Sequence, residues 1–99
     1  MAQHVGVAKS VGADKKREAN TLARAIGAEI TRLRVSKGWS QAEMAHLIGY
    51  TEKWVRSTEM GANTTVELLA AVSSLFSTQL SDIIAAAESG IKKSTKPTV

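Results

Sequence analysis

Four polar residues within one short stretch have the chemistry and the spacing to read the edges of DNA bases. They are Glu52, Lys53, Arg56 and Ser57. A helix that begins after Thr51 places them on one outward face. Arginine or lysine can donate to guanine O6 and N7, and a glutamate can accept from cytosine N4. Taken alone, such charges are more often simply solvated, and Glu52 equally suits the first turn of a helix, where the helix dipole favours an acid.

Two short predicted helices carry this stretch. Ser40 and Glu43 form the pattern of a capping box at the start of one helix, and Gly49 ends it. Thr51 can cap the next helix, which is predicted to end at Met60. Two short helices joined at a glycine can cross steeply, so that the second protrudes and fits a major groove about 12 Å wide. The sequence therefore predicts a helix-turn-helix.

Apolar residues at helical spacing predict three further helices around this motif. The first ends at about Val35, with Asp14 or Asn20 as its cap, and the other two begin near Thr65 and Leu80. The residues expected to face the shared core are Leu22, Ile26, Ile30, Leu33, Met44, Ala45, Ile48, Val55, Thr58, Val66, Leu69, Val72, Phe76, Leu80 and Ile83.

The periodic part of the chain predicts one compact all-α domain over residues 14–90. Within this domain, Gly27 lies inside the first predicted helix, where glycine lowers helix stability relative to alanine. A glycine at such a position suggests that another backbone approaches closely there. Residues 1–13 show no period and predict a flexible N-terminal arm. Residues 91–99 predict a disordered basic tail.

The net charge of +4 is distributed unevenly. Residues 1–37 hold eight Lys and Arg against three acids, whereas residues 38–90 hold two against six. Attraction to a polyanion is therefore expected at the two ends and along the first helix. Lys15, Lys16 and Arg17 are candidate DNA contacts of the arm, although a short charge run is usually just solvated.

Several classes of protein are not expected. The chain has no cysteine, which excludes disulfides and thiolate metal sites. His4 and His46 show no metal-ligand spacing, and no nucleophile–base–acid set or phosphate-cradling loop is present. No apolar run approaches the length of a membrane span, and the N-terminus lacks the apolar block of a secretory signal. We expect a non-enzyme without cofactor or metal, in the cytoplasm and with the nucleoid when bound to DNA.

The stretch from Leu22 to Ile84 resembles the lambda Cro/repressor-like helix-turn-helix family, also called the XRE family. The residues that carry the resemblance are Ile26, Gly27, Leu33, Arg34, Ser40, Gln41, Glu43, Met44, Ala45, Ile48, Gly49, Thr51, Val55, Glu59, Gly61 and the closing run 80–84. The resemblance implies a five-helix domain, dimeric binding to an operator and a regulatory role.

The resemblance also implies contacts to the DNA. Glu52, Lys53, Arg56 and Ser57 match the outward positions of the recognition helix, which read bases. The residues expected to contact the DNA backbone are Gln41, Thr51, Asn63 and Thr64, with Arg34 and Lys37 supplying further charge. Trp54 departs from the family pattern, because that position is usually small or polar.

An apolar stripe on the fourth predicted helix indicates an interface. Leu68 and Leu75, with Ile84 on the fifth helix, are expected to pair two copies of the chain about a two-fold axis. The function expected is a dimeric repressor that reads a palindromic operator in double-stranded DNA. The alternative is an antitoxin-like protein that neutralises a protein partner, such as a toxin, and autoregulates its operon.

Overall fold

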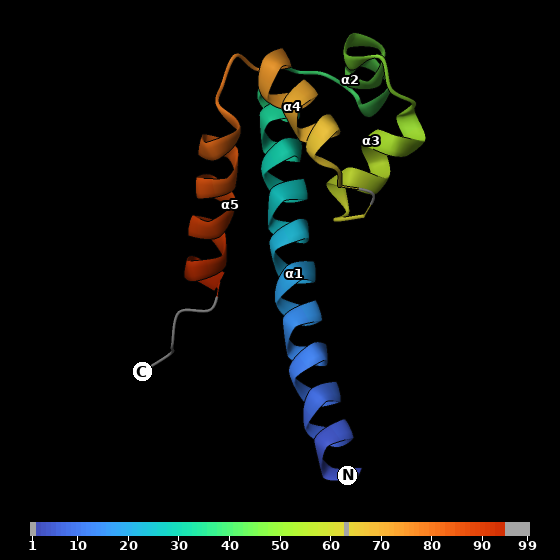
Figure 1. Cartoon of the computed structure of the whole chain (residues 1–99). Helices are drawn as coiled ribbons and strands as arrows, with labels where there is room; N and C mark the ends of the chain where they lie inside the picture. Colours follow the sequence, from blue (N-terminus) through green and yellow to red (C-terminus); the bar gives the residue numbers. More distant parts are fainter. Residues whose placement is uncertain (1, 63, 95–99) are drawn as a thin grey trace.

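Five helices follow one another in this computed structural model, which describes residues 2–62 and 64–94 (Figure 1). No strand occurs in these two ranges. The helices are α1 (Ala2–Ser36), α2 (Gln41–Ile48), α3 (Glu52–Glu59), α4 (Val66–Leu75) and α5 (Leu80–Ser94). The predicted all-α fold with five helices is confirmed.

Local capping interactions begin α2, α3 and α4 where the sequence predicts. The Ser40 hydroxyl accepts from the Glu43 N–H while the Glu43 carboxylate accepts from the Ser40 N–H, which completes the capping box. Thr51 and Thr65 cap α3 and α4 through their hydroxyls. Gly49 ends α2 at a φ of 76°, a left-handed conformation that favours glycine.

The core draws side chains from all five helices, with α1 packed mainly on α3 and α5. Its fully buried side chains include Ile30, Met44, Val55 and Val72, as predicted. Val66 does not join them, because it begins α4 and remains 74% exposed. Its place at the outer end of the helix puts it beyond the packed layer.

Helix α1 stands at the centre of the molecule, with α5 on one side and α2 and α3 on the other (Figure 1). It begins at Ala2, so the flexible arm predicted for residues 1–13 is wrong over residues 2–13, and residue 1 lies outside the described residues. The stretch contains no proline, and extending an existing helix by one residue costs far less than starting a new one. The prediction missed this extension because it relied on apolar periodicity.

Helix α5 also runs further than predicted, to Ser94 rather than ending near Gly90. The half-buried Ile91 lies beside α1 and lines the same hollow as Leu22, which extends the packed contact by a turn. Residues 91–94 are therefore helical and not a disordered tail, and residues 95–99 lie outside the described residues.

No single helix in the described residues is long and apolar enough to cross a membrane. The helices at 66–75 and 80–92 reach the necessary length and apolarity only when taken together, and a bend of 102° separates them.

Candidate nucleic-acid interface

The outer face of α3 presents the polar side chains that the sequence singled out. Glu52, Lys53 and Arg56 are exposed, and Ser57 is half-buried beside them. The Arg56 guanidinium lies 3.3 Å from the Glu52 carboxylate, and about half of each side chain is open to solvent. An exposed pair of this kind contributes little to stability and is readily exchanged for another partner.

Trp54 adds an apolar surface to the same end of α3. Its side chain is 39% exposed, so it is neither buried in the core nor fully solvated. The ring therefore lies within reach of a ligand that approaches α3.

The inner face of α3 is fixed by close packing on α1. Val55 and Thr58 are each 2% exposed. A Cβ added at Gly27 would lie 2.5 Å from the Glu59 carbonyl oxygen and 2.6 Å from that of Thr58. The close backbone approach predicted at Gly27 is confirmed, and it sets how deeply the end of α3 is seated.

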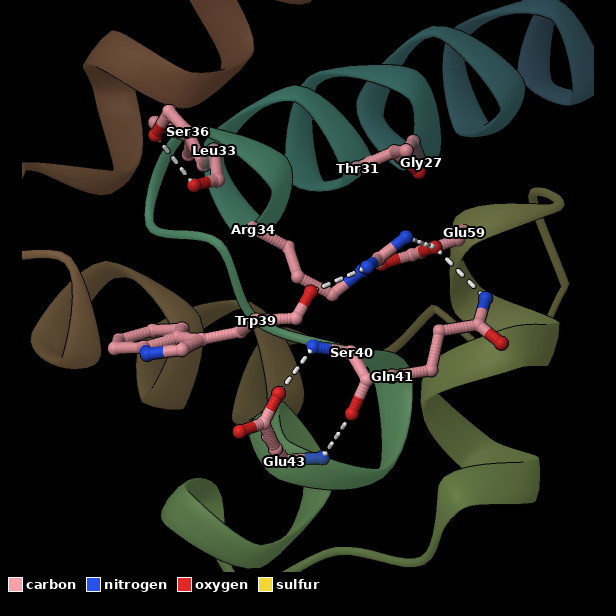
Figure 2. A network of polar contacts seen from close by, with 10 residues as sticks. All are labelled: Gly27, Thr31, Leu33, Arg34, Ser36, Trp39, Ser40, Gln41, Glu43 and Glu59. Carbon is pink, nitrogen blue, oxygen red and sulfur yellow. Dashed lines mark hydrogen bonds and ion pairs between the residues drawn. The ribbon is translucent and has the colours of Figure 1, made fainter.

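A buried polar cluster locks the same end of α3 to α1 and α2 (Figure 2). Arg34 Nε donates to Glu59 Oε2 at 2.6 Å, and Arg34 Nη2 donates to Oε1 at 3.2 Å. Gln41 Nε2 donates to the same Oε1 at 2.9 Å. Arg34 Nη1 donates to the Trp39 carbonyl at 2.6 Å. Three helices therefore meet at the Glu59 carboxylate, and Arg34 also ties the loop before α2 to this cluster.

This cluster corrects the role predicted for Arg34. All three of its guanidinium nitrogens are engaged and its side chain is only 13% exposed, so it is not available to a phosphate. The reason is that Glu59, 5% exposed, is a buried charge that requires a partner within the protein. Glu59 was among the residues that carry the family resemblance, but no role was predicted for it. Its place near the end of α3, with an arginine at the end of α1, was the available signal.

The other residues predicted to contact the DNA backbone differ in how the structure places them. Gln41 is held by Glu59, yet it lies at the start of α2, where backbone N–H groups suit an anion. The Thr51 hydroxyl accepts from the Trp54 N–H, and Lys37 is exposed. The Thr64 hydroxyl is buried with no hydrogen-bond partner in the described part of the chain, and Asn63 lies outside it.

Lys15, Lys16 and Arg17 are exposed on α1, and Arg17 lies 3.7 Å from Asp14. Arg24, one turn before Gly27, was not predicted as a contact. Its Cγ would lie 2.8 Å from a Cβ at Gly61, so this exposed arginine packs against the loop after α3.

The interface predicted on α4 is wrong for one of its members. Leu68 is 1% exposed and belongs to the core, while Leu75 and Ile84 are partly buried against it. Both stripes of α4 are used within the chain because the helix packs between α2 and α5. The surface that was expected to pair two copies is therefore mostly internal.

No cluster of three or more His, Asp or Glu side chains with the spacing of a metal site occurs in the described residues. Arg32 donates to both oxygens of the Glu29 carboxylate, and this hydrogen bonding raises the pKa of Arg32 further above its usual value.

The fold of this chain has a counterpart among solved structures. No family model and no curated protein matches the sequence. The fold is similar to the crystal structure of the clp gene regulator ClgR from C. glutamicum, with a TM-score of 0.65 and 25% sequence identity. The match covers 71% of this chain and 92% of that one. The chain thus shares the helical fold of a known gene regulator.

Proposed function

We propose that this protein is a sequence-specific DNA-binding transcriptional regulator. One observation carries the proposal: α3 is fixed on its inner side and open on its outer side, where Glu52, Lys53 and Arg56 are exposed. A helix held this way can enter a major groove without refolding. The similarity to ClgR, itself described as a gene regulator, supports the same conclusion.

The exposed side chains favour particular base pairs. Arg56 and Lys53 suit guanine, Glu52 suits cytosine, and Trp54 offers a face to a thymine methyl group. The α2 N-terminus at Gln41 would contact a phosphate and fix the register of α3 on the duplex. We infer a half-site that is rich in G·C pairs at the positions next to α3.

The proposal extends to a dimeric repressor that recognises a palindromic operator and acts by occluding a promoter. Two-fold pairing matches a palindrome, in which half-sites lie one helical turn apart. The apolar stripe on α4 supported both this dimer and the alternative, an antitoxin-like partner protein, and the burial of Leu68 removes that support from both.

Selection of bound sites from random DNA tests the function. The wild type is expected to yield an inverted repeat, and Arg56→Ala is expected to lose roughly 1–3 kcal/mol of binding and to relax preference at one position per half-site. Lys37→Ala is the matched control, since a phosphate contact weakens binding to all sequences alike. Wild-type protein that enriches no sequence over random DNA would reject the proposal.

A further inference from the structure

Arg24 lies at the contact between α1 and the loop that follows α3, which runs beside the middle of α1 (Figure 1). A Cβ placed on Gly61, directly after the C-cap of α3, would lie 2.8 Å from Arg24 Cγ and 3.0 Å from Arg24 Cα. Glycine at this position therefore lets the arginine stem pack closely on the loop, and its φ of 90° favours glycine as well. Arg24 is nevertheless exposed, so this packing holds the stem and leaves much of the residue open to solvent.

Arg24 also differs from the other four arginines of the chain in its charge partners. Each of the others lies 2.6–3.7 Å from a carboxylate oxygen, namely Arg17, Arg32, Arg34 and Arg56. No such partner is found for Arg24 in the part of the chain that the structure describes. Its guanidinium can therefore bind an anion without giving up an ion pair within the protein.

The loop beside Arg24 has no charge of its own. Residues 61–65 are a glycine, an alanine, an asparagine and two threonines. Thr64 was predicted to contact the DNA backbone from this loop, but its hydroxyl is buried. The nearest acid of α3, Glu59, is already engaged by Arg34 and does not compete for Arg24. A cation that neutralises a phosphate next to this loop must therefore come from another element, and Arg24 is the exposed cation that packs on it.

We propose that Arg24 binds a phosphate of the DNA backbone next to the bases that α3 reads. This inference rests on the proposed function, which brings the duplex against the outer face of α3. An arginine fork can donate two hydrogen bonds to one phosphate, and a stem already held by Gly61 loses less conformational freedom on binding. The contact carries no sequence information and fixes the position of α1 and α3 on the duplex.

Fluorescence anisotropy with a random-sequence duplex, over a series of KCl concentrations, tests the contact. Arg24→Gln is expected to weaken binding about tenfold and to reduce the slope of log affinity against log salt by about 1. Arg24→Lys keeps the charge and is expected to keep the slope, with part of the affinity lost because lysine cannot form the fork.

Arg32→Gln is the matched control. It removes the same charge from an exposed position of α1, but Arg32 is engaged by both oxygens of Glu29, so affinity and slope are expected to match the wild type. An unchanged slope for Arg24→Gln, even with weaker binding, would show that Arg24 only supports the loop and would overturn the proposal. An equal fall in slope for Arg32→Gln would overturn it too, because the effect would then be one of net charge.

Neutral methylphosphonates, placed one at a time in a duplex selected by the wild type, locate the contact. One substitution per half-site is expected to weaken binding of the wild type about tenfold and to leave binding of Arg24→Gln unchanged. Equal effects on both proteins at every phosphate would overturn the assignment. A wild type that selects no sequence, with the slope reduced in Arg24→Gln alone, would reject the proposed function and leave the phosphate contact standing. A wild type that does not bind the random duplex at all would overturn both.

Discussion

The two faces of α3 each carry an arginine–glutamate pair, and the two pairs differ in burial. On the inner side, the Arg34 and Glu59 side chains are 13% and 5% exposed, and Gln41 shares the carboxylate. On the outer side, Arg56 and Glu52 are 53% and 50% exposed and stand one helical turn apart on the same helix. Both pairs join a guanidinium to a carboxylate, but one pair is buried and the other is exposed, and this difference gives them opposite roles.

A buried pair cannot exchange partners without leaving a charge uncompensated, so it fixes the helix that carries it. An exposed pair is screened by water and contributes little, so its arginine remains available to a new acceptor. In the proposed function, α3 is thus held by the inner pair and binds DNA through the residues of the outer one. The substitutions below test this contrast.

The largest effect is expected at the inner carboxylate. Glu59→Ala leaves Arg34 buried without its partner and should lower the free energy of unfolding by about 3–5 kcal/mol. Urea unfolding followed by circular dichroism measures the loss. Glu52→Ala, the same change on the outer face, is the control and should cost no more than about 0.5 kcal/mol. Equal losses for the two variants would contradict the contrast.

A smaller loss is expected where α1 touches the inner end of α3. Gly27→Ala places a Cβ 2.5 Å from a backbone oxygen, which cannot move aside as a side chain can. The overpacking should cost about 1–3 kcal/mol and displace α3, and DNA binding should weaken with it. Ala28→Gly, at an exposed position of the same helix, serves as the control, because it lowers stability mainly through helix propensity and should leave binding intact.

One substitution on the inner face should stabilise the protein. The buried Thr58 hydroxyl has no hydrogen-bond partner in the described residues, so its desolvation is not offset. Thr58→Val keeps the shape and should raise the free energy of unfolding by about 1 kcal/mol. Thermal unfolding checks the sign, and Thr58→Ser, which keeps the hydroxyl and opens a cavity, should move the midpoint downward.

The smallest effect is expected at the outer acid. Glu52→Gln removes the pairing with Arg56, which is worth about 0.3–0.5 kcal/mol in a helix, so stability should barely change. Binding to random DNA should tighten about threefold, or ~0.6 kcal/mol, because one repulsion toward phosphate is lost. Fluorescence anisotropy with random and selected duplexes measures both affinities. If the Glu52→Gln variant prefers the selected duplex over random DNA by the same factor as the wild type, then Glu52 reads no base.

Local signals predicted much of this fold because they act between neighbours in the chain. The Ser40 and Glu43 box, the turn at Gly49 and the Thr51 cap each depend on residues within a few positions of one another. The outward set on α3 followed from the resemblance to a known family, whose outward helix positions these residues match. The length of α1 was missed because helix extension through residues 2–13 leaves no apolar period to detect.

Burial of the longer-range partners could not be predicted in the same way. Leu68 has the spacing of an exposed stripe, yet α4 packs on two sides and uses it in the core. Arg34 has the chemistry of a phosphate contact, yet Glu59, 25 residues later, occupies it. Both outcomes depend on which surfaces meet when the helices dock.

The sequence alone therefore determined where α2, α3 and α4 begin, because caps are local, and its resemblance to a known family indicated which side chains α3 presents outward. The tertiary structure decided which of two identical ion pairs is a fixed support and which is available for binding. Desolvation separates them, and it is set only when α1 and α2 close over Glu59.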